Sequence, residues 1–368
     1  MQYKLLKMNK LFFSFLLLIA FGFSSCETDI DLNAEYKDIP VVYGLINPSD
    51  TNHYIKITKA FIGDANAYDL AANADNFNYQ DGELTVEVTE YNFDGIFVKT
   101  YLLTRTVNEI PKDPGIFDNS SNVLYKFVEP NINKNSTYKL KIYNKTLEKE
   151  ILSETKIVGI NVSDVGSPST MQIIRLWLGE PYTGLPNELS ITVTPNNDIG
   201  RLDVTFIVNY DEHYTLASGL DSVPKSVRIP IGDKLAFGTK VEWILSGSTV
   251  MDYLVKNVPN PIDIPYFSHR ALTRVSMEFN VAGTELSTYM LVSEPSNTVN
   301  QDKPSYTNIE NGLGIFSSRT KINWVSTAGS PSFPINLDSE TIMKLKSLGL
   351  GFCFGISATS GHKCNQLP

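Results

Sequence analysis

The stretch Ile39-Pro-Val-Val-Tyr-Gly-Leu-Ile46 decides the fold, because its β-branched and aromatic residues are typical of a buried strand. A turn cluster, Asn47-Pro-Ser-Asp50, follows it, and these residue types favour chain reversal. The next segment, Tyr54–Phe61, alternates around Ile55 and Ile57. We therefore expect this segment to pair back on the first strand as a hairpin.

Further strand patterns follow this hairpin up to residue 158. Apolar and polar residues alternate in 84–89, and Asp94-Gly95 predicts a hairpin turn into one strand over 96–107. The remaining patterns cover 123–128, 138–143 and 149–158. About seven strands at this spacing predict an immunoglobulin-like β-sandwich over residues 39–158.

Tyr138 opens one of these strands directly after a turn. This position resembles the tyrosine corner of immunoglobulin-like sandwiches, in which the hydroxyl bonds to backbone a few residues upstream. The alternative is an ordinary strand tyrosine. Both readings give Tyr138 a structural role.

Residues 159–368 predict a larger β-rich domain with a few short helices. Strand patterns include 189–194, 202–209, 227–231, 241–245, 274–281 and 314–325. One helix is predicted around Val250–Val258, with Ser248 or Thr249 as its N-cap. Asp338 is expected to cap a second helix that ends near Gly349. The predicted fold class is therefore mainly β.

Composition excludes some classes of function. The chain has 368 residues, a formal net charge of -9 and 11% aromatic residues. An acidic chain lacks the basic surface that nucleic-acid binding requires, so we expect no nucleic-acid partner.

The N-terminal residues have the pattern of an export signal. Three lysines precede an apolar run, Leu11–Phe23, which is shorter than the about 20 residues that a membrane-spanning helix needs. The run leads into Ser24-Ser25-Cys26, as in bacterial lipoprotein signals, where the cysteine carries the acyl chains. We predict a signal over 1–25, lipidation of Cys26 and an acidic tether over 26–38. The alternative is a plain cleaved signal followed by a chance cysteine.

Two further cysteines, Cys353 and Cys364, remain if Cys26 is acylated. An exported protein reaches an oxidising compartment, so a Cys353–Cys364 disulfide is expected there. The alternative is two separate buried thiols.

Motifs for catalysis or cofactor binding are not evident in the sequence. It has four histidines and contains no His-Glu-x-x-His, Gly-x-Ser-x-Gly, phosphate loop or Cys-x-x-Cys. We therefore assign no catalytic residue, no metal site and no cofactor. A long polar loop over 63–80 could offer oxygen ligands to calcium, but its spacing departs from the EF-hand, which favours a polar surface loop. It is our candidate contact loop, and its candidate residues are Asp64, Asn66, Asp69, Asn73, Asp75 and Asn78.

Two stretches carry a family resemblance. They are Val41-Val-Tyr-Gly-Leu-Ile46 with its continuation His53–Phe61, and Tyr306-Thr-Asn-Ile-Glu-Asn-Gly-Leu-Gly-Ile-Phe316. Together they resemble the Bacteroidetes lipoproteins grouped as DUF4249, a domain of unknown function, although the 63–80 loop is longer than is usual there. The resemblance implies an outer-membrane lipoprotein often encoded near a TonB-dependent receptor, and it supplies no catalytic residues. Gly312 and Gly314 in the second stretch predict a tight turn into a buried strand.

These observations leave two functions open. The first is a lipoprotein held to the bilayer by Cys26, on the periplasmic or cell-surface face, that binds rather than catalyses and has a TonB-dependent receptor as an expected partner. The alternative is an exported hydrolase of surface glycans or peptides, whose carboxylates converge only in the fold.

Overall fold

The computed structural model describes residues 39–60, 66–115, 117–118, 120–216, 219–294, 305–326 and 336–353. The predicted signal, the whole predicted tether with Cys26, and Cys364 lie outside these ranges. The described chain is mainly β with a few short helices, which confirms the predicted fold class. No helix in the described ranges is both long enough and apolar enough to cross a bilayer.

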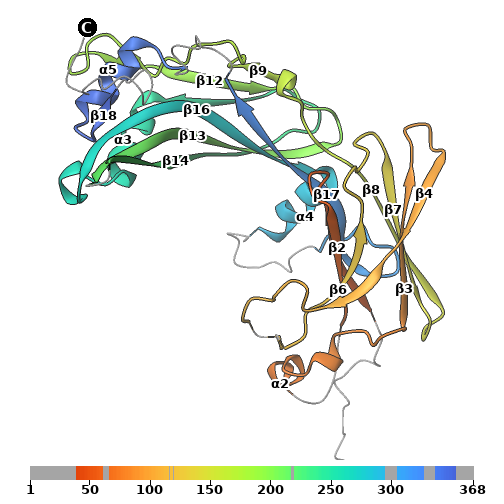
Figure 1. Ribbon diagram of the computed structural model, residues 1–368. Coiled ribbons are helices and arrows are strands. Elements are labelled where there is room, and N and C mark those ends of the chain that lie inside the picture. Colours follow the sequence, from red (N-terminus) through yellow and green to blue (C-terminus); the bar gives the residue numbers. More distant parts are fainter. Residues whose placement is uncertain are drawn as a thin grey trace, which may run out of the picture.

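The N-terminal half forms a sandwich of two sheets (Figure 1). One sheet contains, in spatial order, β4 (Phe97–Leu102), β3 (Leu84–Tyr91), β7 (Thr137–Asn144) and β8 (Lys149–Lys156). The other contains β1 (Pro40–Ile46), β2 (Asn52–Lys59), β6 (Val123–Val128) and β5 (Thr104–Val107). These two orders correspond to strands C′-C-F-G facing A-B-E-D, which is an immunoglobulin-like arrangement.

The single strand predicted over 96–107 is wrong, because the chain changes sheets at Leu103. Residues before Leu103 form β4 in one sheet, and residues after it form β5 in the other. The Leu103 side chain is buried in the sandwich core, and its N–H donates to the carbonyl of Val86 at 2.9 Å. Burial of this one side chain between the layers is what divides the strand.

Tyr138 forms the predicted tyrosine corner. Its side chain is fully buried, and the backbone N–H of Asn133 donates to its hydroxyl oxygen at 3.0 Å. Tyr138 is the second residue of β7, which corresponds to strand F. The bond fixes the loop between β6 and β7 against the start of β7.

Strand β17 (Leu313–Val325) joins the two halves of the molecule. Its first residues pair in parallel with β1, from Val41 opposite Leu313 to Ile46 opposite Ser318. Its later residues pair with β16 (Phe267–Gly283). Ile309 and Phe316 pack in the same core as buried residues of the range 42–157. The hydrophobic core of the sandwich therefore includes residues far beyond position 158.

The start of β17 requires glycine at position 314. Gly314 has φ +103°, and a Cβ atom there would lie 2.0 Å from the carbonyl oxygen of Val42. Asn308 donates to the Phe316 carbonyl at 2.7 Å and accepts from the Phe316 N–H at 2.9 Å. The motif is therefore a fold determinant that seats β17 against β1.

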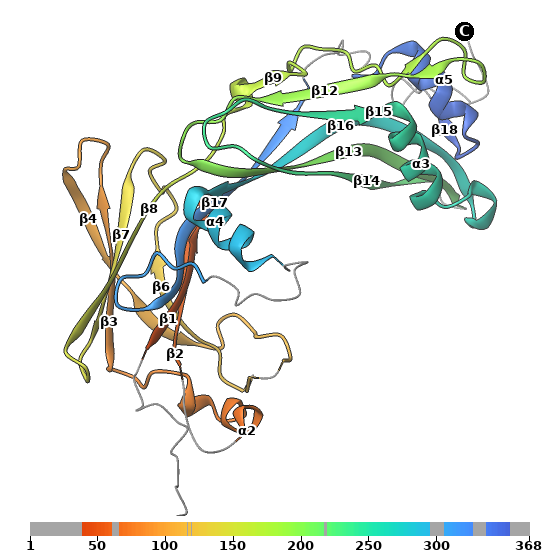
Figure 2. The same ribbon diagram turned by 180° about the vertical axis from the view of Figure 1, so that it is seen from behind.

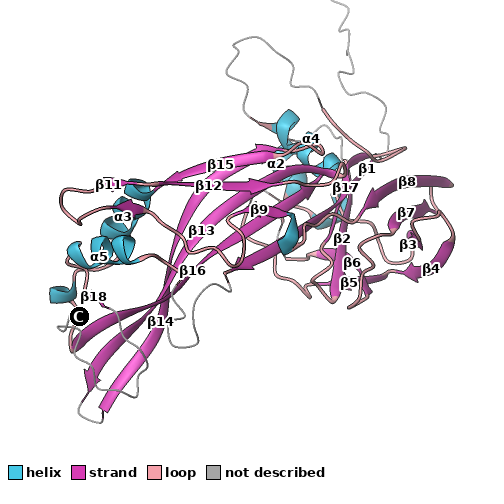
Figure 3. Ribbon diagram, turned by 90° about the horizontal axis from the view of Figure 1, so that it is seen from above, coloured by secondary structure: helices cyan, strands magenta, loops and turns pink. Residues whose placement is uncertain are grey.

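The second half is built on three long strands that continue the sheet beyond β17. They are β16, β13 (Ile199–Leu216) and β14 (Gly219–Leu235), and the short β18 (Phe352–Cys353) pairs with β16. A three-stranded sheet, β9 (Val165–Ser167), β12 (Glu188–Val193) and β15 (Val241–Ser246), lies over them (Figure 3). The side chains between these layers form a second hydrophobic core.

Short helices complete the fold, and two of them confirm predictions. Helix α3 (Gly247–Asn257) is capped by Ser246, two or three residues before the predicted cap, and α5 (Ser339–Ser347) is capped by Asp338 as expected. Helix α4 (Thr284–Ser293) was not predicted. The remaining short elements are α2 (Ala67–Ala71), β10 (Trp177–Leu178), β11 (Leu185–Pro186) and the 3-10 turns Ala74–Asn76, Val162–Asp164 and Pro261–Asp263.

The two halves meet at an angle, which we call the elbow. The long strands run across the top of Figure 1, the sandwich descends from one end of them, and α4 lies on the inner side of the angle. Figure 2 shows the same relation from behind, with α2 at the end of the sandwich far from the long strands.

Candidate functional site

A cavity of about 910 Å³ lies at the elbow, and we call it the elbow pocket. Its floor is the outer face of β1, β2 and β6, and its other walls come from α4, β17 and the loop before β6. Its lining residues are Tyr43, Leu45, Ser49, Asp50, Thr51, Asn52, His53, Tyr54, Lys56, Ile110, Asn122, Leu124, Leu286, Tyr289, Ile315 and Arg319.

Strand alternation places the floor residues. Val42 and Ile46 on β1, and Ile55 and Ile57 on β2, are buried in the sandwich core. Their neighbours in sequence therefore point to the opposite face of the sheet. This is why Tyr43, Leu45, Tyr54 and Lys56 line the pocket, and Tyr43 is the register partner of Lys56.

Helix α4 closes one side of the pocket. The Leu286 N–H faces the Ser317 hydroxyl oxygen at 3.3 Å, which fixes the helix on β17. The Tyr289 hydroxyl donates to the Tyr43 hydroxyl at 3.5 Å, and the two rings meet edge to face with centroids 6.4 Å apart. The contact with Tyr289 and partial burial raise the pKa of Tyr43 to about 12, so the Tyr43 hydroxyl is a neutral hydrogen-bonding group at neutral pH.

Lys56 is the most perturbed charge at the pocket. Its Nζ donates to the Asn122 side-chain oxygen at 2.9 Å. Burial, and then the nearby charge of Lys112, lower the pKa of Lys56 to about 8. Within the described ranges no ion pair involves Lys56, Lys112 or Arg319. The cations at the pocket therefore form no ion pair with a carboxylate of the described chain.

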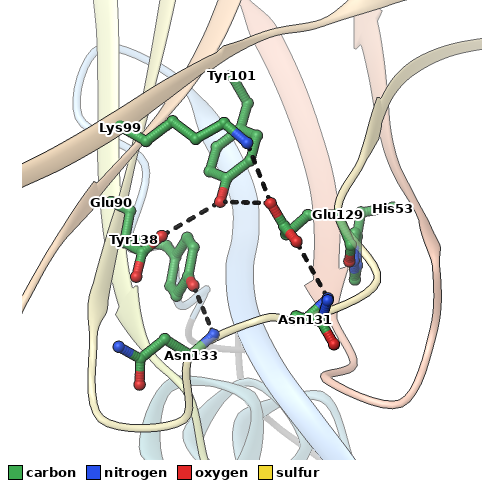
Figure 4. A network of polar contacts seen from close by, with 8 residues as sticks. All are labelled: His53, Glu90, Lys99, Tyr101, Glu129, Asn131, Asn133 and Tyr138. Carbon is green, nitrogen blue, oxygen red and sulfur yellow. Dashed lines mark hydrogen bonds and ion pairs between the residues drawn. The ribbon is translucent and has the colours of Figure 1, made fainter.

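A second polar cluster lies inside the sandwich near the tyrosine corner (Figure 4). The Tyr101 hydroxyl lies 3.2 Å from an oxygen of Glu90 and 3.1 Å from one of Glu129. Ser136 donates to Glu90 at 2.8 Å, and Lys99 pairs with Glu129 at 3.1 Å. The cluster therefore ties together β3, β4 and the loop between β6 and β7.

Glu90 and Glu129 form part of a structural hydrogen-bond network. Glu90 is only 6% exposed, and neither carboxylate lines the elbow pocket. Burial and the two carboxylates raise the pKa of Tyr101, so this hydroxyl keeps its proton. The backbone N–H of Asn131, and then Lys99, outweigh burial and hold the pKa of Glu129 below its usual value. A general acid needs a raised carboxyl pKa and access to substrate, and Glu129 has the opposite shift.

From residue 66 onward the candidate contact loop contains a short helix and a 3-10 turn, and many of its polar side chains form local hydrogen bonds. Asn66 accepts from the Tyr68 N–H as the cap of α2, and Asn73 accepts from the Asp75 N–H. Asp75 also accepts from Gln80, and Asn78 is buried, 3.5 Å from the Ser121 hydroxyl.

The other two of the six loop residues are Asp69 and Asp64. Asp69 is exposed on α2, and Asp64 lies outside the described residues. Across the described ranges, no three His, Cys, Asp or Glu side chains gather as a metal site would require. The contact role of the loop stays a prediction.

Cys353 is buried and disulfide-bonded. Its predicted partner, Cys364, lies outside the described residues, as does Cys26. The Cys353–Cys364 pairing and the lipidation of Cys26 therefore remain predictions.

Sequence reasoning did not identify the elbow pocket. Lys56 lies in a stretch singled out for its strand pattern, whereas Arg319 and Tyr289 come from distant parts of the chain. The one signal in the sequence was Lys56, a charged residue in a strand whose alternate residues, Ile55 and Ile57, are buried in the core.

Comparisons with known proteins add little. No protein-family model and no curated protein matches the sequence. Among solved structures, the C-terminal globular domain of an oligosaccharyltransferase from Pyrococcus abyssi matches with 10% identity over 58% of this chain and 42% of that one. Its TM-score of 0.16 is too low to carry an argument about fold or function.

Proposed function

We propose that the protein is a lipoprotein of the outer membrane, anchored through Cys26, that binds a ligand at the elbow pocket without transforming it. The observation that supports binding is the pocket itself, which is open, has a mixed apolar and cationic lining and lies on a rigid sheet. Ligand sites are commonly concave, mostly apolar and furnished with a few placed polar groups.

The hydrolase alternative receives less support. His53, which lines the pocket, uses Nε2 for the backbone carbonyl of Glu129 at 3.0 Å, and its ring stacks on Phe127 with centroids 4.7 Å apart. It is therefore placed as a packing residue. The carboxylates Glu90 and Glu129 are joined through Tyr101 inside the sandwich instead of flanking a cleft.

The expected TonB-dependent receptor would meet a different part of the molecule. The Ala60 N–H, at the entry to the contact loop, donates to the carbonyl of Ile39 at 2.9 Å, where the tether joins the fold. If Cys26 is acylated, the contact loop would lie at the end of the sandwich nearest the bilayer. Helix α2, which belongs to this loop, lies at the end of the sandwich far from the long strands (Figure 2).

The anchor and the partner are testable together in cells. Metabolic labelling with a palmitate analogue is expected to mark the wild type and not Cys26→Ser, because only a lipidated cysteine carries acyl chains. Cross-linking followed by mass spectrometry is expected to recover an outer-membrane receptor with the wild type. A variant with 63–80 shortened should lose this receptor but keep the label.

Two outcomes would contradict the proposal. Labelling that survives Cys26→Ser would refute the anchor. Recovery of no receptor, together with turnover of a glycan or peptide by the purified protein, would favour the hydrolase.

A further inference from the structure

We propose that the ligand of the elbow pocket is an amphiphilic organic anion, with a carboxylate, sulfonate or phosphate group held at Lys56 and an apolar or aromatic body lying along the strands. This inference rests on the proposed binding function, because it names the class of ligand for the same pocket.

The balance of charge around the pocket is the first argument. The chain as a whole has a net charge of -9, yet the pocket is lined by Lys56 and Arg319 and by a single carboxylate, Asp50. Asp50 is exposed at the turn between β1 and β2 and accepts from the Asn47 side chain at 3.0 Å. A local concentration of one sign of charge in a concave site attracts ligands of the opposite sign.

The state of Lys56 is the second argument. An ammonium group has three donor hydrogens, and Lys56 uses one of them on Asn122. Removing a cation from water without an opposite charge is unfavourable, and the charge of Lys112 adds repulsion. An anion beside Lys56 would offset both the desolvation of the ammonium group and the repulsion from Lys112. It would also accept hydrogen bonds from the remaining N–H groups, whereas a neutral ligand would leave the charge uncompensated.

The apolar lining is the third argument. Leu45 and Leu124 lie on the floor, and Ile110 and Leu286 come from the loop before β6 and from α4. A bare inorganic ion would leave these side chains in contact with water. The volume of about 910 Å³ suits a molecule with a substantial apolar body.

Two probes with the same ring system separate charge from apolar contact. They are 8-anilinonaphthalene-1-sulfonate, an anion, and N-phenyl-1-naphthylamine, its neutral counterpart. Fluorescence titration of the mature chain is expected to show binding of both, with the sulfonate bound more tightly. Lys56→Met should weaken sulfonate binding roughly tenfold, as for loss of a charge-assisted hydrogen bond, and leave the neutral probe unchanged.

Two control variants make the result interpretable. Lys56→Arg keeps the charge and should retain most of the sulfonate affinity. Lys139→Met removes an exposed lysine from an ion pair on the other sheet and should change neither titration.

Unchanged sulfonate binding in Lys56→Met would overturn the proposal, as would equal losses for the two probes. Failure of the wild type to bind either probe would also overturn the ligand class. The anchor and receptor tests would be unaffected by that failure, so the two proposals can fail separately.

Discussion

Gly314→Ala is expected to lower the free energy of unfolding by about 3 kcal/mol or more, because two penalties coincide at this residue. Gly314 has φ +103°, which side-chain-bearing residues rarely adopt, and a Cβ atom would lie 2.0 Å from the Val42 carbonyl oxygen. To relieve that overlap, β1 must separate from β17. The parallel pairing that joins the sandwich to the long sheet would then be lost.

Gly232→Ala is the matched control for this substitution. Gly232 has φ +114°, but a Cβ atom there would meet nothing within 4 Å. It should therefore show only the conformational penalty, about 1–2 kcal/mol. The two variants are compared by urea unfolding monitored by circular dichroism. Equal losses would show that the close approach to Val42 is not what requires glycine at position 314.

Arg270→Met is expected to destabilise the second half by about 3–5 kcal/mol, the usual cost of leaving a buried charge without its partner. Arg270 is completely buried, its Nε donates to Glu212 at 2.8 Å, and its guanidinium lies over the Phe267 ring. It also donates to the Leu350 carbonyl. The side chain therefore holds β13, β16 and the segment before β18 together.

The double variant Glu212→Gln/Arg270→Met is expected to be more stable than Arg270→Met, because no unpaired carboxylate is left in the interior. Lys139→Met, at an ion pair in which both side chains are more than half exposed, should cost about 0–1 kcal/mol. A double variant no more stable than the single variant would show that Glu212 and Arg270 are not energetically coupled.

The same pair gives a pH dependence with a definite sign. Burial alone would raise the pKa of Glu212, but hydrogen bonds from Tyr214 and Arg270 and the charge of Arg270 outweigh it and hold this pKa below its usual value. The stability contributed by Glu212 is therefore present above the unfolded-state pKa and is lost as the pH falls through the folded-state pKa. On acidification through that range, the wild type should therefore lose more stability than the double variant, which lacks the carboxylate; urea unfolding of both proteins across this pH range measures the difference.

Local patterns in the sequence predicted the local structure. Alternation around Ile55 and Ile57 identified the first hairpin, and the position of Tyr138 after a turn identified the tyrosine corner. Both features depend on residues close together in the sequence. Asp338 likewise identified the start of α5. Helix α4 was not predicted, because its N-cap, Gly283, has no capping side chain and its sequence has little apolar periodicity.

Long-range pairing could not be read from the sequence. Strand β1 pairs with β17, so Val41 lies opposite Leu313. Local sequence patterns do not indicate which distant strand will pair with β1. The strand predicted over 202–209 is shorter than β13, which continues through Glu212 to Leu216. Arg270 on the neighbouring strand neutralises the Glu212 carboxylate inside the fold. The elbow pocket depends on these same pairings, since α4 and Arg319 reach the floor residues only through β17.

Binding without chemical change at the elbow pocket is the central claim, and native mass spectrometry of the protein released gently from its own membranes tests it most directly. We expect the wild type to carry a small organic molecule as additional mass. The molecule should be depleted in Lys56→Met, retained in Lys139→Met and recovered with the same mass after incubation with the protein. A wild type without additional mass, equal occupancy in Lys56→Met, or a molecule converted to products would contradict the claim.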